Sequence, residues 1–197
     1  PAAAPVALYP GMGGVQTGPL APRRIPGQGT ETLADNFSFS GADLARAEWT
    51  DHRLLYATPE FTEPLHISGT PRITLRLAAD RPAANLSVWL VSLPWTEGRA
   101  PRGGIVTRGW ADPQNHASLT ESGPLVPGEF YELTFELQPD DQVLQPGQRL
   151  GLMVFSSDRE FTLRPAPGTE LTVDLDGTRL ELPVVGGEAA LDRALGG

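Results

Sequence analysis

The chain has 197 residues, 40% of them hydrophobic, and its 24 acidic and 15 basic side chains give a formal net charge of -9. All of the basic residues apart from three His are Arg, and Cys and Lys are absent; this excludes a thiol nucleophile, a disulfide framework, a cysteine zinc site and a catalytic or P-loop lysine. The acidic balance, with a pI near 4.8, argues against nucleic-acid binding, which needs a basic surface.

The first 36 residues are rich in turn formers, with six Pro and six Gly. We therefore expect 1–36 to be an irregular, extended lead-in with little helix. Gly11, Gly13 and Gly14 resemble the start of a phosphate loop, but Gln16 stands where the next glycine is needed, so we do not expect phosphate binding. Because the sequence begins with Pro rather than Met, we expect a piece processed or excised from a longer chain.

From about Phe37, short apolar runs are separated by Pro, Gly and Asp, which is typical of many short strands. The runs 73–77 and 131–137 alternate apolar and polar residues and predict half-buried strands, the second with an acidic outer face. The runs 86–91 and 149–155 are apolar on both faces and predict central strands. Helical patterns are confined to two short stretches, 41–49 and 188–195.

Asp176 and Gly177 predict a β-hairpin, because Asp-Gly is a favoured two-residue turn when both central residues need positive φ. The same register pairs Asp174 with Arg179 across the strands on the solvent side. Asp174, Asp176 and Gly177 also resemble the opening of a calcium loop. Val185 stands where that loop needs its bidentate Glu, so we favour the hairpin.

These runs amount to eight to ten strands without alternating long helices. Two packed antiparallel sheets satisfy this pattern, so we expect an all-β, jelly-roll-like antiparallel β-sandwich of the galactose-binding-domain-like kind over 37–197, preceded by the 1–36 lead-in. The length is that of one such domain. No apolar run approaches the ~20 residues that cross a bilayer, so we expect no membrane span.

Three blocks of the sequence carry a family resemblance. They are LLYATP at 54–59 with LHISGTP at 65–71, PLVPG at 124–128, and QPGQRLGLMVFSSD at 145–158. In this order and spacing they resemble the C-terminal domain of bacterial Xaa-Pro dipeptidyl-peptidases, serine hydrolases related to cocaine-esterase-like acylases. The resemblance covers about 50–186, and the lead-in is similar to the linker that follows the catalytic domain in bacterial members.

The resemblance implies a parent enzyme whose α/β-hydrolase domain carries a Ser-Asp-His triad and releases N-terminal dipeptides with proline second. The β domain would pack on that hydrolase domain and shape the entrance for a proline-containing peptide without supplying the nucleophile. The residues agree, because a nucleophile elbow needs Gly two residues before and after the Ser, and neither Ser68 nor Ser122 has them. We expect no catalytic residue, cofactor or metal in this chain, and a secreted parent.

Four residues are candidates for contact with the hydrolase domain or its substrate. Trp95, in a loop beside 97–99, and Trp110, in a similar place after Arg108, are large aromatics with no evident burial of their own. Exposed aromatics with Arg nearby often mark an interface. His116 ends an unusually polar loop. The alternatives are local packing for Trp95, Arg108 and Trp110, and a plain loop role for His116.

Two rival functions stay open. Many jelly rolls bind sugars by stacking aromatic rings, so Trp95 and Trp110 are equally compatible with a carbohydrate-binding module. An independent esterase that uses a Ser outside any known motif is the third hypothesis. We expect Trp89 to belong to the core, and His52 and His66 to be surface or edge residues.

Overall fold

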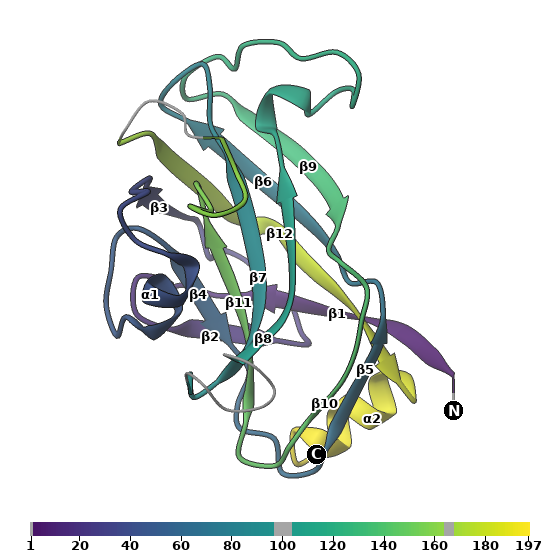
Figure 1. Ribbon diagram of the computed structural model, residues 1–197. Coiled ribbons are helices and arrows are strands. Elements are labelled where there is room, and N and C mark those ends of the chain that lie inside the picture. Colours follow the sequence, from purple (N-terminus) through teal and green to yellow (C-terminus); the bar gives the residue numbers. More distant parts are fainter. Residues whose placement is uncertain (1, 97–103, 164–167) are drawn as a thin grey trace.

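The computed structural model describes residues 2–96, 104–163 and 168–197, and these are mostly β-strand (Figure 1). Two short helices are described, α1 (Gly41–Arg46) and α2 (Gly187–Ala194), with a 3-10 turn, η2 (Pro113–Asn115), between them in sequence. The strands are β1 (Ala3–Pro10), β2 (Gly18–Ala21), β3 (Thr30–Ala34), β4 (Leu54–Ala57), β5 (Leu65–Gly69), β6 (Arg72–Ala79), β7 (Leu86–Leu93), β8 (Ile105–Ala111), β9 (Phe130–Glu136), β10 (Asp140–Leu144), β11 (Arg149–Phe155) and β12 (Glu170–Val185).

The strands form two layers. The first layer contains β10, β5, β12, β6 and β9, with β3 also paired to β12; the second contains β2, β4, β11, β7 and β8. β1 pairs with β12 and with β2 and so joins the layers. Only β2 and β4 pair in parallel among the described strands. The expected all-β, antiparallel, sandwich-like fold is confirmed, and the jelly-roll connectivity stays a prediction.

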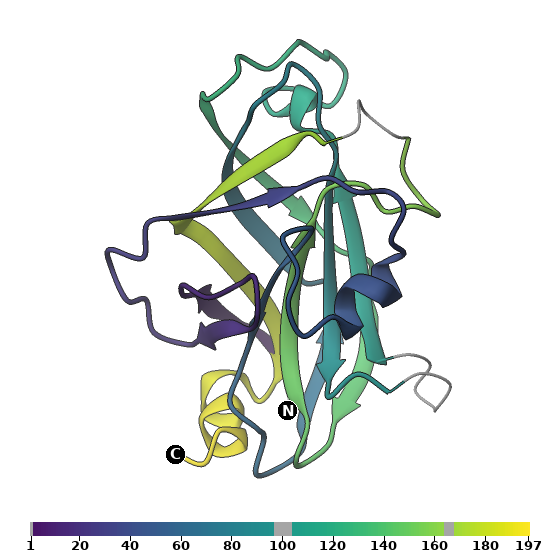
Figure 2. The same ribbon diagram turned by 90° about the vertical axis from the view of Figure 1, so that its left-hand side faces the viewer.

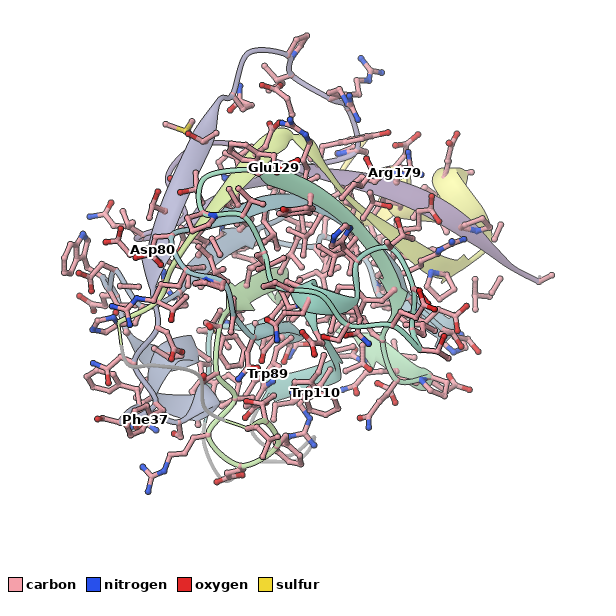
Figure 3. The ribbon with its side chains drawn as sticks, turned by 90° about the horizontal axis from the view of Figure 1, so that it is seen from above. Phe37, Asp80, Trp89, Trp110, Glu129 and Arg179 are labelled. Atoms are coloured by element: carbon pink, nitrogen blue, oxygen red, sulfur yellow. The ribbon has the colours of Figure 1, made fainter. Side chains whose placement is uncertain are left out.

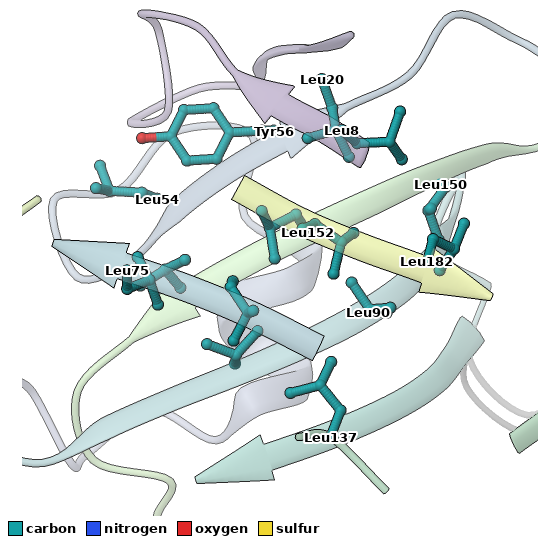
Figure 4. Close-up of a cluster of buried hydrophobic side chains, with 14 of the residues drawn as sticks. Leu8, Leu20, Leu54, Tyr56, Leu75, Leu90, Leu137, Leu150, Leu152 and Leu182 are labelled. Carbon is teal, nitrogen blue, oxygen red and sulfur yellow. The ribbon is translucent and has the colours of Figure 1, made fainter. Parts of the chain in front are cut away.

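The main hydrophobic core lies between the two layers (Figure 4). Leu75 of β6, Leu90 of β7, Leu152 of β11 and Leu182 of β12 meet there, and each is fully buried. The strands predicted from periodicity are confirmed as β6, β7, β9 and β11. β7 is buried along its whole length because β11 and β8 flank it and both of its faces are covered.

The lead-in is more regular than we expected. It contains β1, β2 and β3, and β1 pairs with β12 over six residues, with Leu8 opposite Leu180. Val6 and Leu8 of β1 are buried in the main core. The expectation of an irregular segment over 1–36 was wrong because the strand is fixed by pairing with the far end of the chain, which local composition does not register. That a catalytic domain precedes it stays a prediction.

The predicted hairpin at Asp176 and Gly177 is also wrong. β12 continues through these residues as one strand of 16 residues, with a register shift against β6 between Asp174 and Arg179. Neither Asp176 nor Gly177 has positive φ, so the turn favoured by the dipeptide does not form.

Interactions with other segments hold this irregular stretch of β12 in place. Asp174 forms an ion pair with Arg76 of β6 rather than with Arg179. Asp176 accepts hydrogen bonds from the backbone N–H groups of Gly27 (2.9 Å) and Gly29 (3.1 Å), and the bond from Gly29 contributes most to lowering the pKa of its carboxyl. Long-range contacts therefore replace the local turn.

Both helices lie where the sequence predicts them, and both are short. Within the described ranges, no helix has the length and apolar character of a membrane span.

Candidate functional site

The outer face of the second layer carries an arginine surrounded by aromatic rings. Trp89 of β7 lies opposite Arg108 of β8, so both side chains are on one face. The guanidinium carbon of Arg108 is 4.4 Å from the ring centre of Phe161, 5.5 Å from that of Trp89 and 5.8 Å from that of Trp110. Each distance is within the ~6 Å over which a ring face attracts a cation. We call these four residues the Arg108 cluster.

A single buried carboxylate fixes the rings of this cluster. Asp158 is 1% exposed, and its Oδ2 accepts hydrogen bonds from the indole N–H groups of Trp89 (2.9 Å) and Trp110 (3.0 Å), which lie beside each other in Figure 3. The backbone carbonyl of Asp158 accepts the N–H of Phe161 at 2.9 Å. This turn places the Phe161 ring on that of Trp110, with ring centres 5.1 Å apart. Asp158 therefore positions all three rings.

Helix α1 covers part of the same face. Gly41 lies directly against the Trp89 ring, since a Cβ at position 41 would be 2.2 Å from it. The helix begins with a capping box, in which Ser40 Oγ accepts the Asp43 N–H and Asp43 accepts the Ser40 N–H. The Ser40 hydroxyl also donates to Asp43 Oδ2 at 2.7 Å, and this bond, followed by the one from the Ser40 N–H, holds the pKa of Asp43 below its usual value. Leu44 then packs on the outer apolar cluster that contains Trp89.

A buried arginine attaches α1 to the rest of the domain. Arg53 is fully buried and donates to the carbonyls of Ala47 (2.6 Å), Gly14 (2.7 Å) and Leu44 (3.2 Å). Burial lowers its pKa to about 10. Two of these carbonyls belong to the carboxyl end of α1, so Arg53 stabilises that end as a C-terminal cap does.

The partly buried carboxylate of Glu31 and the buried Tyr56 fix the loop between β1 and β2. Glu31 accepts hydrogen bonds from the hydroxyl of Tyr56 (2.7 Å) and from the N–H groups of Gly13 (2.9 Å) and Gly14 (3.0 Å). Burial, followed by the nearby Glu31 charge, raises the pKa of Tyr56. The Gly14 carbonyl also accepts a hydrogen bond from Arg53. The β1–β2 loop, β4 and α1 are therefore linked to one another behind the outer face.

An open groove of about 550 Å³ runs along α1. Trp49 and Phe39 stand at it with 61% and 41% of their surfaces exposed, and Phe39 stacks on His52. Arg159 donates to the Ser38 carbonyl, which connects the groove to the loop of the Arg108 cluster. The groove is lined by Ser38, Phe39, Asp43, Leu44, Arg46, Ala47, Trp49 and Thr50.

The predicted candidate His116 lies at a second cavity, of about 370 Å³, which Trp110 also lines. Its ring centre is 4.3 Å from that of Tyr131. Asn115 lines the same cavity, and its Oδ1 is buried with no hydrogen-bond partner among the residues the structure describes. The structure therefore brings together three of the four predicted residues, with Trp110 between Arg108 and His116.

Trp95 lies apart from the other three. It packs on the outer apolar cluster, and Gly104, just before β8, lies against its ring. Trp110 is near the opposite end of β8, roughly 20 Å along the strand. Trp95 and Trp110 therefore cannot stack on one sugar ring. Residues 97–99, which we placed beside Trp95, lie outside the described residues.

The sequence misplaced one residue of the site and missed others. Trp110 is in strand β8 and not in a loop as expected, because it pairs with Ser87 of β7. Asp158, Phe161 and the exposed Trp49 were not predicted. The available signal was an acidic residue, Asp158, three residues after the largely apolar 149–155 run.

The remaining histidines lie outside this face or in its support. His66 is on β5 with its Nε2 2.5 Å from Asp141 Oδ1, and His52 is partly buried beside Phe39. In the described part of the chain, no serine hydroxyl is hydrogen-bonded to a histidine. The same part holds no group of three or more His, Asp or Glu arranged to bind a metal ion.

Comparison with known sequences gives matches over nearly the whole chain. A family model described as the X-Pro dipeptidyl-peptidase C-terminal non-catalytic domain matches 1–191. A putative Xaa-Pro dipeptidyl-peptidase of Rhodopirellula baltica is 60% identical over 194 residues, which are 98% of this chain and 31% of the relative. The chain thus spans about a third of that relative's length.

Two solved structures share the fold. An alpha-amino acid ester hydrolase superimposes with a TM-score of 0.70 and 20% identity, over 92% of this chain and 36% of that one. An aminopeptidase from a marine sediment archaeon of the Thaumarchaeota gives a TM-score of 0.72 and 17% identity, over 93% and 37%. In both, the matching region is again little more than a third of the larger chain.

Proposed function

The chain belongs to the family of X-Pro dipeptidyl-peptidase C-terminal non-catalytic domains, and from this premise we propose that it is the accessory β domain of a larger Xaa-Pro dipeptidyl-peptidase. The nucleophile and its triad belong to an α/β-hydrolase domain elsewhere in the parent chain. That domain acts on proline-containing peptides. The missing Gly-x-Ser-x-Gly elbow in this chain supports the division of labour.

We further propose that the domain stabilises the hydrolase domain and shapes the entrance to its active site. The supporting observation is the outer face of the second layer, where Arg108 and partly exposed aromatic side chains sit on a rigid apolar base. A face of this composition is characteristic of a protein interface. We assign His116 and Trp110, which line the neighbouring cavity, to this entrance.

Turnover of a chromogenic Xaa-Pro dipeptide tests the division of labour. The complete parent should hydrolyse it and the isolated chain should not. Deleting this domain from the parent should lower the thermal unfolding temperature of the remainder. Turnover by the isolated chain that persists after immunodepletion of full-length enzyme, or an unchanged unfolding temperature after deletion, would contradict the proposal.

A matched pair of histidine variants tests the role at the entrance. In the complete parent, His116→Ala should change kcat/KM for longer Xaa-Pro peptides more than for the chromogenic dipeptide, because only the longer peptide reaches the entrance. His66→Ala, on β5 of the other layer, should change neither. Equal effects of the two variants on both substrates would argue against an entrance role.

A further inference from the structure

We propose that Arg108 is a preformed binding site for a carboxylate, and that the occupant is an Asp or Glu side chain on the catalytic part of the parent enzyme. The inference rests on the proposed function, because it requires a larger parent chain. It adds the face that docks and the chemistry of its central contact. Figure 2 shows α1 and the segment after β11, which flank this face, on the same side of the molecule.

Among the residues that the structure describes, Arg108 has no polar partner for its guanidinium, whereas three other arginines of the sheets do. Arg76 and Arg179 pair with carboxylates, and Arg149 donates to a backbone carbonyl. In residues 2–96, 104–163 and 168–197, the Arg108 guanidinium has no ion pair or hydrogen bond, and it lies over three aromatic rings. Its five N–H donors are therefore available to a ligand, even though the chain carries nine more acids than bases.

The buried carboxylate of Asp158 binds the indole N–H groups of the cluster and not the Arg108 guanidinium. Its Oδ2 already accepts two indole N–H groups, and it is 1% exposed. It holds Trp89 and Trp110 in place, and its backbone holds Phe161. Arg108 is thereby ordered before any partner arrives. An ordered guanidinium loses less conformational entropy on binding, and its planar fork fits both oxygens of a carboxylate.

The surroundings of Arg108 fit a protein partner better than a free anion. Phe161 is 49% exposed and Leu163 91% exposed beside the cluster, and Trp49 is 61% exposed at the adjoining groove. A small anion would leave these side chains in water, whereas a protein surface would cover them around a central polar contact. The Rhodopirellula baltica relative has more than two thirds of its length outside the matched region, which supplies such a surface.

The absence of Cys in this chain allows a clean test by thiol labelling. Glu160→Cys places a thiol between Asp158 and Phe161, and Glu132→Cys places a matched thiol on β9 in the other layer; both native side chains are exposed. Alkylation rates are read by mass spectrometry of the labelled peptide, for the isolated chain and for the complete parent. We expect at least a tenfold slower reaction at position 160 in the complete parent, and less than a twofold change at position 132.

The role of Arg108 is tested in the same background. Arg108→Gln in the complete parent should return labelling of Glu160→Cys to within threefold of the isolated-chain rate, while Arg179→Gln leaves it protected. Near-UV circular dichroism of each isolated variant verifies that the rings remain packed; if Arg108→Gln disturbs them, Arg108→Met, which keeps an unbranched apolar stem against the rings but no guanidinium, replaces it.

The possible failures can be told apart. Equal labelling at position 160 in both contexts would overturn the proposed face while leaving the accessory function intact, provided that deletion of the domain still destabilises the parent. Protection that persists in Arg108→Gln would overturn the carboxylate contact. If deletion of the domain does not lower the unfolding temperature of the parent, the proposed function is refuted.

Discussion

Replacing Gly41 by Ala tests the packing of α1 on the second layer. The added Cβ would lie 2.2 and 2.3 Å from the two nearest ring carbons of Trp89, whereas carbon atoms in contact are about 3.5–4.0 Å apart. Helix or ring must therefore move by more than about 1 Å. Overpacking of this kind costs about 1–3 kcal/mol. Ala has the higher helix propensity, by up to about 1 kcal/mol, so propensity and packing predict opposite signs.

We expect packing to dominate, and Gly41→Ala to lower the unfolding temperature by roughly 2–12 °C, at 2–4 °C per kcal/mol for a chain of this size. Near-UV circular dichroism should report the displaced Trp89 ring. Gly123→Ala is the matched control, because a Cβ there has no atom within 4 Å and its φ is not positive. It should leave the unfolding temperature within about 2 °C.

A double-mutant cycle with Trp89→Leu isolates the clash. Leu removes the ring atoms that the new Cβ would meet, so the two substitutions together should destabilise less than their sum by about 1 kcal/mol or more. A Gly41→Ala variant as stable as wild type, or additive effects in the cycle, would show that α1 does not press on Trp89 as described.

Three further predictions concern polar groups near α1 and the outer face. Asp158→Ala leaves the buried indole N–H of Trp89 without its acceptor and should lower the free energy of unfolding by about 2–4 kcal/mol in urea titrations; a neutral effect would refute the assignment. Tyr56→Phe removes the hydrogen bond to Glu31 and should lower it by about 1–2 kcal/mol, whereas an equal or higher urea midpoint would count against that bond. Because the pKa of Asp43 is lowered from 3.8 in the folded state, its charge stabilises fully above that pH and the effect disappears as pH falls through the lowered value. Wild type and Asp43→Asn should therefore differ in urea midpoint at pH 7 and converge near pH 2, and a constant gap would contradict this.

The layers of the sheet could be predicted because periodicity reports burial directly. Leu86, Val88 and Leu90 face the main core while Trp89 and Val91 face the outer cluster, so the run reads as apolar on both faces, as a central strand must. Both short helices were found for a similar reason, since their apolar spacing is local.

The features that the sequence did not predict depend on distant partners. Asp176 and Gly177 are a good turn dipeptide, but pairing of β12 with β1, β3 and β6 and hydrogen bonds from the lead-in keep these residues within one continuous strand. Arg108 and Trp110 were recognised as candidates from residue type alone. The cluster they form depends on Asp158 and Phe161, which lie about 50 residues further along the chain and carry no local signal of that contact.

The pairing of β1 with β12 joins residues near the two ends of the chain, and this affects how the chain folds. Leu8 of β1 pairs with Leu180 of β12, so about 170 residues must be synthesised after β1 before its partner exists. At ~5–20 residues per second the ribosome leaves residues 3–8 of β1 without their β12 partner for on the order of ten to thirty seconds. Such long-range pairing also slows folding itself. Pro5 and Pro10 interrupt the hydrogen-bond donors of β1, and proline on an unpaired strand discourages association with other chains. Pro5 and Pro10, which made this strand hard to predict from the sequence, thus protect it from association until β12 has been synthesised.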